Sequence, residues 1–153
     1  MAAFWLVKSE PDTYPFHQLE ADGRTMWDGV RNYQARNFMR DNMRVGDLVL
    51  FYHSSTAVPG VVGVARVASE PYPDPTQFQP DSPYYDPKAS TAEPRWHLVD
   101  LEPEQRLPRL VSLEEMKGDP GLEGMLLLKR GNRLSVMPVE RTHFERVLEL
   151  ANT

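Results

Sequence analysis

The sequence predicts a single α+β domain, residues 1–153, in which five or six short strands form a curled or barrel-like sheet flanked by short helices. The length of 153 residues and a hydrophobic content of 41% suit one compact domain. The apolar runs are short and β-rich, and Pro and Gly turn signals separate them from short helical patterns. A curled sheet is the arrangement in which such short strands most readily bury their apolar faces.

The first half of the chain predicts one buried strand and two short helices. Residues 4–8 (FWLVK) are typical of a short buried strand. Pro15 suits the first position of a helix, and Gly23 suits the residue after its end. Asn32 is expected to cap a second helix. The inner face of that helix would contain four apolar residues, Ala35, Phe38, Met39 and Met43.

A hairpin should follow the second helix. Gly46-Asp47 turns the chain into residues 48–54 (LVLFYHS), and Pro59-Gly60 turns it into residues 61–69 (VVGVARVAS). Two β-rich runs joined by a short polar loop predict antiparallel pairing.

The second half predicts two strands and two capped helices. Residues 95–102 (RWHLVDLE) alternate with a period of two, and residues 133–139 also read as a strand. Ser112 and Thr142 each begin a capping-box pattern, so a helix should open at each. The helix that begins at Thr142 should bury three apolar side chains, Phe144, Val147 and Leu148.

Residues 70–94 should form a proline-rich loop. Seven of the 14 prolines lie there, a density that neither a helix nor a central strand tolerates. The segment also contains four aromatic residues, Tyr72, Phe78, Tyr84 and Tyr85. Those aromatics favour a packed loop over a disordered one, and loops of this length are often functional.

Composition excludes several classes of protein. No apolar run is long enough to span a bilayer, so we expect no membrane partner, and the first residues do not resemble a secretory signal. The chain has no cysteine, which excludes disulfides and thiolate chemistry and is compatible with the cytoplasm. A net charge of −5 disfavours non-specific binding to phosphate backbones, although five arginines and two acids give residues 24–44 a local charge of +3.

The motifs of common enzymes are absent, so we expect no catalytic residue, no metal and no cofactor. The four histidines lack metal-ligand spacing, and neither a dinucleotide-binding motif nor a P-loop is present. His53 adjoins Ser54, but neighbouring residues of a strand point to opposite faces, which disfavours a nucleophile–base pair.

Aromatic residues interleaved with polar ones remain, at strand ends and in loops, where binding sites tend to form. A pocket for a planar heterocycle needs flat walls for stacking and a few oriented hydrogen-bonding groups. A core role is the alternative for Trp27, and either Phe51 or Tyr52 should be core by alternation. Arg36 and Arg40, four residues apart, are most simply a solvated helix face.

Five segments resemble the EVE domain family, in particular its bacterial and thymocyte-nuclear-protein branch. They are residues 5–14 (WLVKSEPDTY), 27–41 (WDGVRNYQARNFMRD), 45–54 (VGDLVLFYHS), 59–67 (PGVVGVARV) and 133–139 (RLSVMPV). The resemblance implies a PUA-like pseudo-barrel with a mixed sheet, related to YTH domains. It further implies a reader of a modified base in DNA or RNA, which holds one extruded base in an aromatic pocket.

The resemblance also implies the residues of that pocket. Its base-binding residues would be Lys8, Ser9, Glu10, Trp27, Arg31, Asn32, Tyr33, Tyr52, His53, Ser54, Tyr85, Asp86 and Pro87. Phosphates would be held by three further cations, Arg36, Arg40 and Lys88. The partner would be DNA or RNA that contains a modified base, and we expect a monomer or a weak dimer.

Two other functions stay open at this point. Related PUA-like folds include hydrolases of acylated cytidine that use a lysine and a carboxylate, for which Lys8 with Glu10 or Glu70 are the candidates. The pocket can also suit a free small molecule with a regulatory role, such as a nucleoside or a buffer-like anion.

Overall fold

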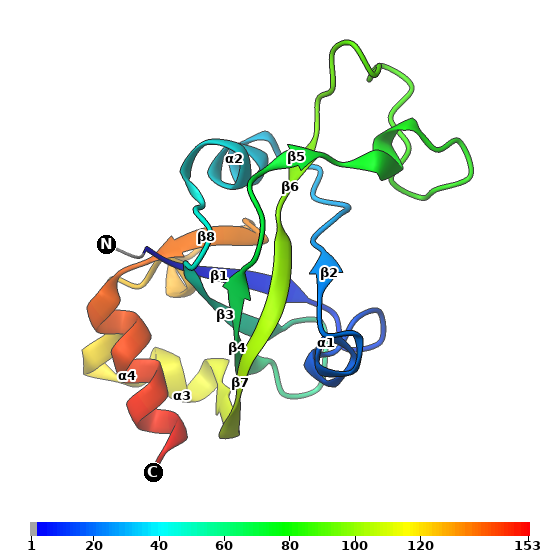
Figure 1. Ribbon diagram of the computed structural model, residues 1–153. Coiled ribbons are helices and arrows are strands. Elements are labelled where there is room, and N and C mark those ends of the chain that lie inside the picture. The colour runs from blue at the N-terminus through cyan, green and yellow to red at the C-terminus, as the bar shows by residue number, and fades with distance from the viewer. Residues whose placement is uncertain (1–2) are drawn as a thin grey trace.

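The computed structural model describes residues 3–153, in which six strands form one curled mixed sheet (Figure 1). The strand order is β2-β7-β4-β3-β1-β8. The strands are β1 (Phe4–Ser9), β2 (Thr25–Met26), β3 (Leu48–His53), β4 (Gly60–Val67), β7 (Asp100–Ser112) and β8 (Val136–Val139). Strand β1 pairs in parallel with β3, and the other pairs are antiparallel, which confirms the predicted α+β class with a mixed sheet.

Short helices cover the sheet. They are α1 (Phe16–Asp22), α2 (Tyr33–Asn37), a π-helical turn η1 (Phe38–Asn42), α3 (Leu113–Lys117) and α4 (Arg141–Ala151). Three 3₁₀ turns join them, η2 (Pro75–Phe78), η3 (Pro120–Leu122) and η4 (Leu126–Leu128). Helices α1 and α4 pack against β7, and η1 packs against β8. Both Phe51 and Tyr52 of the central strand β3 are buried, although simple alternation predicted only one of them in the core.

Local signals in the first half of the chain predicted the helix ends well. Gly23 ends α1 with φ of +75°, a conformation that glycine adopts without steric cost. Pro15 occupies the N-cap of α1, one position before the expected place. The Asn32 side chain accepts a hydrogen bond from the backbone N–H of Ala35 at 2.9 Å, which confirms the predicted cap of α2.

Strand β7 is longer than the sequence indicated. The predicted strand over residues 95–102 is divided between β6 (His97–Leu98) and β7, and β7 then continues through Pro103 and Pro108. Beyond Leu101 this strand pairs only with β4, because β2 pairs with residues 100–101 alone. Pro103 and Pro108 both lie where the register of the β4–β7 pairing shifts. Such irregular positions are where a sheet tolerates proline.

Two details near the C-terminus differ from the prediction. Helix α4 begins at Arg141 after Glu140, so Thr142 lies inside the helix and does not cap it. Leu148 is only half-buried, whereas Leu150 is buried with Phe144 and Val147. The predicted strand over residues 133–139 begins only at Val136. The helix predicted to open at Ser112 is confirmed, because the Ser112 hydroxyl accepts from the N–H of Glu115 and caps α3. The Glu115 carboxylate accepts from Arg109.

The proline-rich segment is a packed loop that extends beyond the sheet at the upper right of Figure 1. It contains β5 (Tyr72–Pro73), which pairs with β6, and the turn η2. Gln77 is fully buried, and its side-chain amide donates to the carbonyls of Asp74 and Trp96 at 2.8 Å each. The same amide accepts from the N–H groups of Arg95 and Trp96 at 2.9 and 3.0 Å. One buried amide therefore fixes both ends of the loop.

Candidate functional site

A cavity of about 530 Å³ opens at the carboxyl end of β1. We call it the Trp27 cavity. It lies between the end of β1, the segment that follows α1, the proline-rich loop and the start of β8. Its lining residues are Lys8, Ser9, Glu10, Thr13, Tyr14, Thr25, Met26, Trp27, Asp28, Gly29, Val30, Arg31, Tyr84 and Ser135. The N–H of Lys8 donates to the carbonyl of Ser135 at 2.9 Å, which places the start of β8 at this cavity.

The indole of Trp27 joins the core to the cavity. Its side chain is only 9% exposed, and the ring packs edge-to-face against Phe51 and Tyr14 at centroid distances of 5.5 and 6.2 Å. The backbone N–H of Trp27 donates to the carbonyl of Val99 at 3.0 Å. The indole is therefore held in one place while part of it contributes to the cavity wall.

Tyr84, in the proline-rich loop, contributes a second aromatic ring to the lining of the Trp27 cavity. Its ring packs directly on Gly29, where a Cβ atom would lie 2.6 Å from the ring. Gly29 also has φ of +81°, so both the close approach and the backbone conformation require glycine.

Arg31 fastens the proline-rich loop to the cavity. Its Nη2 donates to the carbonyl of Tyr84 at 2.7 Å and to the hydroxyl of Thr76 at 3.0 Å. Its Nε also donates to Tyr84, and its Nη1 donates to the Asp74 carboxylate at 3.1 Å. The guanidinium also lies over the Tyr84 ring at 5.6 Å. Arg31 therefore positions the wall, and most of its donors are already occupied.

The carboxylate of Asp74 completes this clamp. Its side chain is 1% exposed, and burial by itself would raise the pKa. Hydrogen bonds from Thr76, from the N–H of Gly29 and from Arg31 outweigh burial and hold the pKa of Asp74 below its usual value. A permanently charged Asp74 thus keeps the loop and the Gly29 turn together.

Two charged side chains in the lining, those of Lys8 and Asp28, have pKa values shifted from their usual ones. Burial lowers the pKa of Lys8, and burial together with the nearby Asp74 raises the pKa of Asp28. Within residues 3–153, neither side chain forms an ion pair. Both groups are therefore available to a polar molecule in the cavity. The hydroxyl of Ser9, in contrast, donates to the carbonyl of Tyr14 at 2.5 Å.

The structure brings five of the expected base-binding residues into the Trp27 cavity, Lys8, Ser9, Glu10, Trp27 and Arg31. The expected residues of β3 and its end lie elsewhere. Tyr52 is buried at 4% exposure, and the N–H of Ser54 donates to the carbonyl of Ser9. The Nε2 of His53 accepts from the N–H of Phe16 at 3.1 Å, which satisfies an otherwise unpaired donor at the start of α1.

The expected residues of α2 and of the loop also lie outside the lining. Asn32 caps α2, and the exposed ring of Tyr33 stacks on Trp96 at 4.7 Å. Tyr85 is 41% exposed, and Asp86 accepts from the indole N–H of Trp96 at 2.8 Å. Pro87 is exposed and contributes nothing to the lining either.

Several lining residues were not among those predicted, and the aromatic and charged ones are Tyr14, Asp28 and Tyr84. Tyr14 and Asp28 lie within the motifs that were already singled out, beside residues assigned to the pocket. Tyr84 directly precedes Tyr85, and only the loop conformation determines which of the two rings faces the cavity.

Two of the expected phosphate-binding cations are engaged within the protein. Arg36 donates to the carbonyl of Arg95 at 2.5 Å and lies over the Tyr33 ring at 4.8 Å. Arg40 forms an ion pair with Asp41 at 2.8 Å, which raises the pKa of the arginine. Lys88 is exposed on the proline-rich loop.

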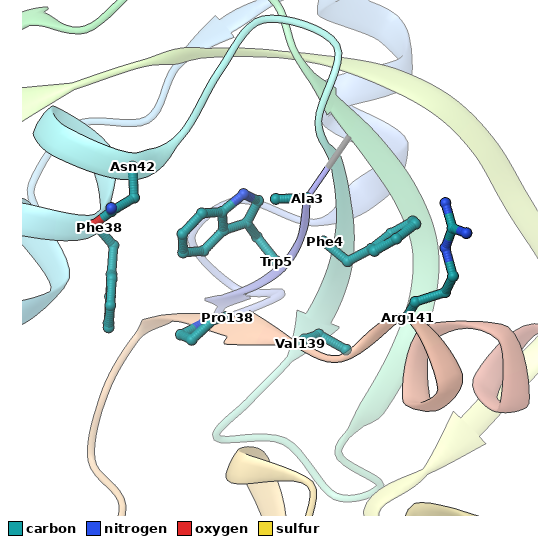
Figure 2. A pocket seen from close by; sticks show the side chains of 8 residues that line it. All are labelled: Ala3, Phe4, Trp5, Phe38, Asn42, Pro138, Val139 and Arg141. Carbon is teal, nitrogen blue, oxygen red and sulfur yellow. The ribbon is translucent and has the colours of Figure 1, made fainter. Parts of the chain in front are cut away.

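A larger hollow of about 650 Å³ lies around Trp5 (Figure 2). Figure 2 shows Trp5 of β1 beside Phe38 of η1 and Pro138 of β8, with the ring of Phe4 directed toward Arg141 of α4. Its lining is mostly apolar, and the indole N–H of Trp5 is already bonded to Asp47 at 2.9 Å. Asn42 and Arg141 are the polar side chains of this lining, and the Arg141 guanidinium already lies over the Phe4 ring at 5.7 Å. Because the Trp27 cavity contains more polar groups beside its aromatic walls, it is the better candidate site.

Two further findings bear on function. Within residues 3–153, no group of three or more possible ligand side chains could hold a metal ion. No helix in the same range is both long and apolar enough to cross a membrane. Glu70, one of the two carboxylates considered for hydrolysis, is exposed and lies outside the Trp27 cavity, whereas Glu10 lines it.

The chain is similar to known proteins over nearly its whole length. The EVE domain model matches residues 3–150. Thymocyte nuclear protein 1 of Homo sapiens is 38% identical over 170 residues, which cover 98% of this chain and 74% of that protein. A crystal structure from Pseudomonas putida superposes with a TM-score of 0.94 at 46% identity, covering 97% of this chain and 99% of the other.

Human THYN1, crystallised in complex with DNA that contains 5-methylcytosine, superposes with a TM-score of 0.93. The identity is 37%, and the match covers 99% of each chain. A YTH domain from Zygosaccharomyces rouxii superposes with a TM-score of 0.56 at 12% identity, covering 98% of this chain and 86% of that chain, a likeness of fold alone.

Proposed function

The chain belongs to the EVE domain family, and from this premise we propose that it is a non-catalytic nucleic-acid-binding domain that reads a modified base. A relative of the same fold, human THYN1, was crystallised with DNA that contains 5-methylcytosine. The observation that carries the proposal is the Trp27 cavity, which combines aromatic walls with unpaired polar groups. Its volume of about 530 Å³ lies within the range of small-ligand sites.

In the proposed complex one nucleotide leaves the base stack and enters the cavity. The base would stack on the accessible part of Trp27, with the ring of Tyr84 as a second aromatic surface. Stacking on an aromatic side chain contributes about 1–3 kcal/mol per base. Arg31 would act indirectly by holding Tyr84 in place, because its own donors are bonded to the loop.

The edge of the base would be read by Lys8 and Asp28. A carboxylate accepts a hydrogen bond from an exocyclic amino group, as aspartate does from the amino group of cytosine. The ammonium of Lys8 would donate to a ring nitrogen or carbonyl oxygen of the same base. This pair favours a base with both an amino group and an acceptor, such as a modified cytosine or adenine, over thymine or uracil.

The adjacent residues Tyr84 and Tyr85 provide a matched test. We would measure the affinity of Tyr84→Ala and Tyr85→Ala for short DNA and RNA strands with and without 5-methylcytosine or N6-methyladenine. Loss of about 1.4 kcal/mol of stacking lowers affinity tenfold, so Tyr84→Ala should bind the preferred modified strand roughly tenfold more weakly. Tyr85→Ala should bind as the natural protein does, since its ring lies outside the cavity.

The reverse result would assign the stacking to Tyr85, as the sequence predicted. If the natural protein binds modified and unmodified strands equally, the reader function is wrong. The Trp27→Phe variant extends the test, because a smaller ring keeps the core packed while it reduces the stacking surface.

One observation favours the alternative function, hydrolysis of acylated cytidine. Lys8 and Glu10 both line the Trp27 cavity, and burial lowers the pKa of the lysine toward that of a usable base. Incubation with acylated cytidine followed by chromatography distinguishes the two functions. Turnover that disappears in Lys8→Ala would favour the enzyme, and absence of turnover together with a preference for modified strands would favour the reader.

A further inference from the structure

A second cavity of about 340 Å³ adjoins the Trp27 cavity, and we call it the basic groove. It is lined by Asn32 and Gln34 at the start of α2, by Leu126 of η4 and by residues 129–134. The two cavities share two chain segments, because Arg31 lines one and Asn32 the other. In the same way, Ser135 lines the Trp27 cavity and Leu134 lines the basic groove. The groove therefore lies next to the site proposed for the base.

The loop over residues 129–134 is a fixed platform. The side-chain amide of Asn132 donates to the carbonyl of Leu126 at 2.9 Å and accepts from the N–H of Leu134 at 3.0 Å. Leu127 and Leu134 are buried on either side of the loop. Gly131 takes φ of +82° at the turn, which a glycine adopts without steric cost. The three cationic side chains of this loop are therefore presented from an ordered backbone.

Every charged residue in the lining of the groove is a cation. Lys129, Arg130 and Arg133 are all exposed, and none of them forms an ion pair in the described part of the chain. Arg40, to which the family resemblance assigned phosphate binding, is instead paired with Asp41. In a chain whose net charge is −5, three unpaired cations within five residues form a local positive field beside the cavity.

We propose that the basic groove binds the sugar–phosphate backbone of the strand whose base enters the Trp27 cavity, a proposal that rests on the proposed function. Arginine and lysine bind phosphate through charge-assisted hydrogen bonds, and such contacts set the register of a strand without reading its sequence. Asn32 and Gln34 lie in the same lining and add neutral donors for phosphate or sugar oxygens. The groove thus fixes the strand, and the Trp27 cavity discriminates between bases.

The test compares Arg130→Gln, Arg133→Gln and the double variant with Lys117→Gln, a control that removes an exposed lysine outside both cavities. The probes are single-stranded DNA oligonucleotides with and without one 5-methylcytosine. Affinity is measured between about 50 and 200 mM salt, the range over which phosphate contacts strongly affect binding. Circular dichroism checks that each variant is folded.

Each single variant should reduce the salt dependence of log affinity by about 0.7, and the double variant by about 1.4, because one phosphate contact is lost per arginine. The affinities for modified and unmodified strands should fall by the same factor. The proposal is overturned if the double variant keeps the salt dependence of the natural protein, or if Lys117→Gln reduces it equally. Equal binding of both strands by the natural protein would overturn the reader function, while the change in salt dependence would still support the groove.

Discussion

A substitution of Arg31 distinguishes a role in positioning the proline-rich loop from a direct contact with nucleic acid. The sequence placed it near the base or its phosphate, whereas the structure shows its guanidinium bonded to Tyr84, Thr76 and Asp74. The Arg31→Lys variant keeps the positive charge but cannot reproduce the planar fork of donors. We therefore expect it to lose the bonds to the loop while it retains electrostatic attraction for a phosphate.

The expected loss follows from the hydrogen bonds. Two bonds to the Tyr84 carbonyl and one to the Thr76 hydroxyl disappear, each worth about 0.5–1.5 kcal/mol. Because one ammonium contact with the buried Asp74 persists, the free energy of unfolding should fall by about 2–3 kcal/mol. For a domain of this size, that loss lowers Tm by about 4–12 °C.

Calorimetry and limited proteolysis test this expectation. The proline-rich loop of Arg31→Lys should be cleaved faster than that of the natural protein, and its affinity for modified strands should fall with little change in salt dependence. Arg40→Lys is the control, since the exposed pair of Arg40 and Asp41 contributes at most about 1 kcal/mol. An Arg31→Lys variant with natural Tm and natural loop protection, but reduced salt dependence of binding, would refute the positioning role.

Two further predictions follow from the cavity and from the start of α1. Gly29→Ala places a Cβ atom 2.6 Å from the Tyr84 ring at φ of +81°, so it should cost about 1–2 kcal/mol from backbone strain and weaken binding of modified strands. Thermal denaturation and titration measure both effects, and a variant with natural values for both would contradict the role of Tyr84 as a wall. Burial lowers the pKa of His53, whose neutral Nε2 accepts from the N–H of Phe16. Because the folded pKa lies below the unfolded value near 6.5, this stabilisation is complete above that pH and is lost as the pH falls through the folded pKa. Denaturation of the natural protein and of His53→Gln across this window should show a weaker acid dependence in the variant, and identical curves would exclude His53 as a contributor.

Much of the fold was accessible from local patterns. Residues 4–8 lie within β1, the predicted hairpin matches β3 and β4, and Asn32 caps α2 as its position indicated. Strand β7 was underestimated because Pro103 and Pro108 are breakers in most contexts. They are tolerated here because both lie where the register of the pairing with β4 shifts, a feature of strand pairing that no local window contains.

For the candidate site, too, local sequence predicted some residues correctly and others not. Lys8, Ser9 and Glu10 are consecutive at the end of β1, so placing one of them at the cavity placed all three. Tyr52, His53 and Ser54 did not follow, because burial of both faces of β3 and the need of α1 for an acceptor determine where they lie. Their proposed role in binding a base, like that of the expected residues on the loop, stays a prediction, as do a monomeric or weakly dimeric state and a cytoplasmic location.

By itself, the sequence determined most of the short strands, the helix caps at Gly23, Asn32 and Ser112, the local charge and the aromatic residues available for a cavity, because each is encoded by neighbours along the chain. Tertiary structure alone decided that Tyr84 and not Tyr85 lines the Trp27 cavity, and that the cations of residues 129–133 lie beside it. Both outcomes depend on contacts between distant segments, namely the clamp of Arg31 on the loop and the hydrogen bond from Lys8 to Ser135. Such contacts form when separate elements bury a shared apolar core, and their geometry is a property of that packing, which local periodicity does not specify.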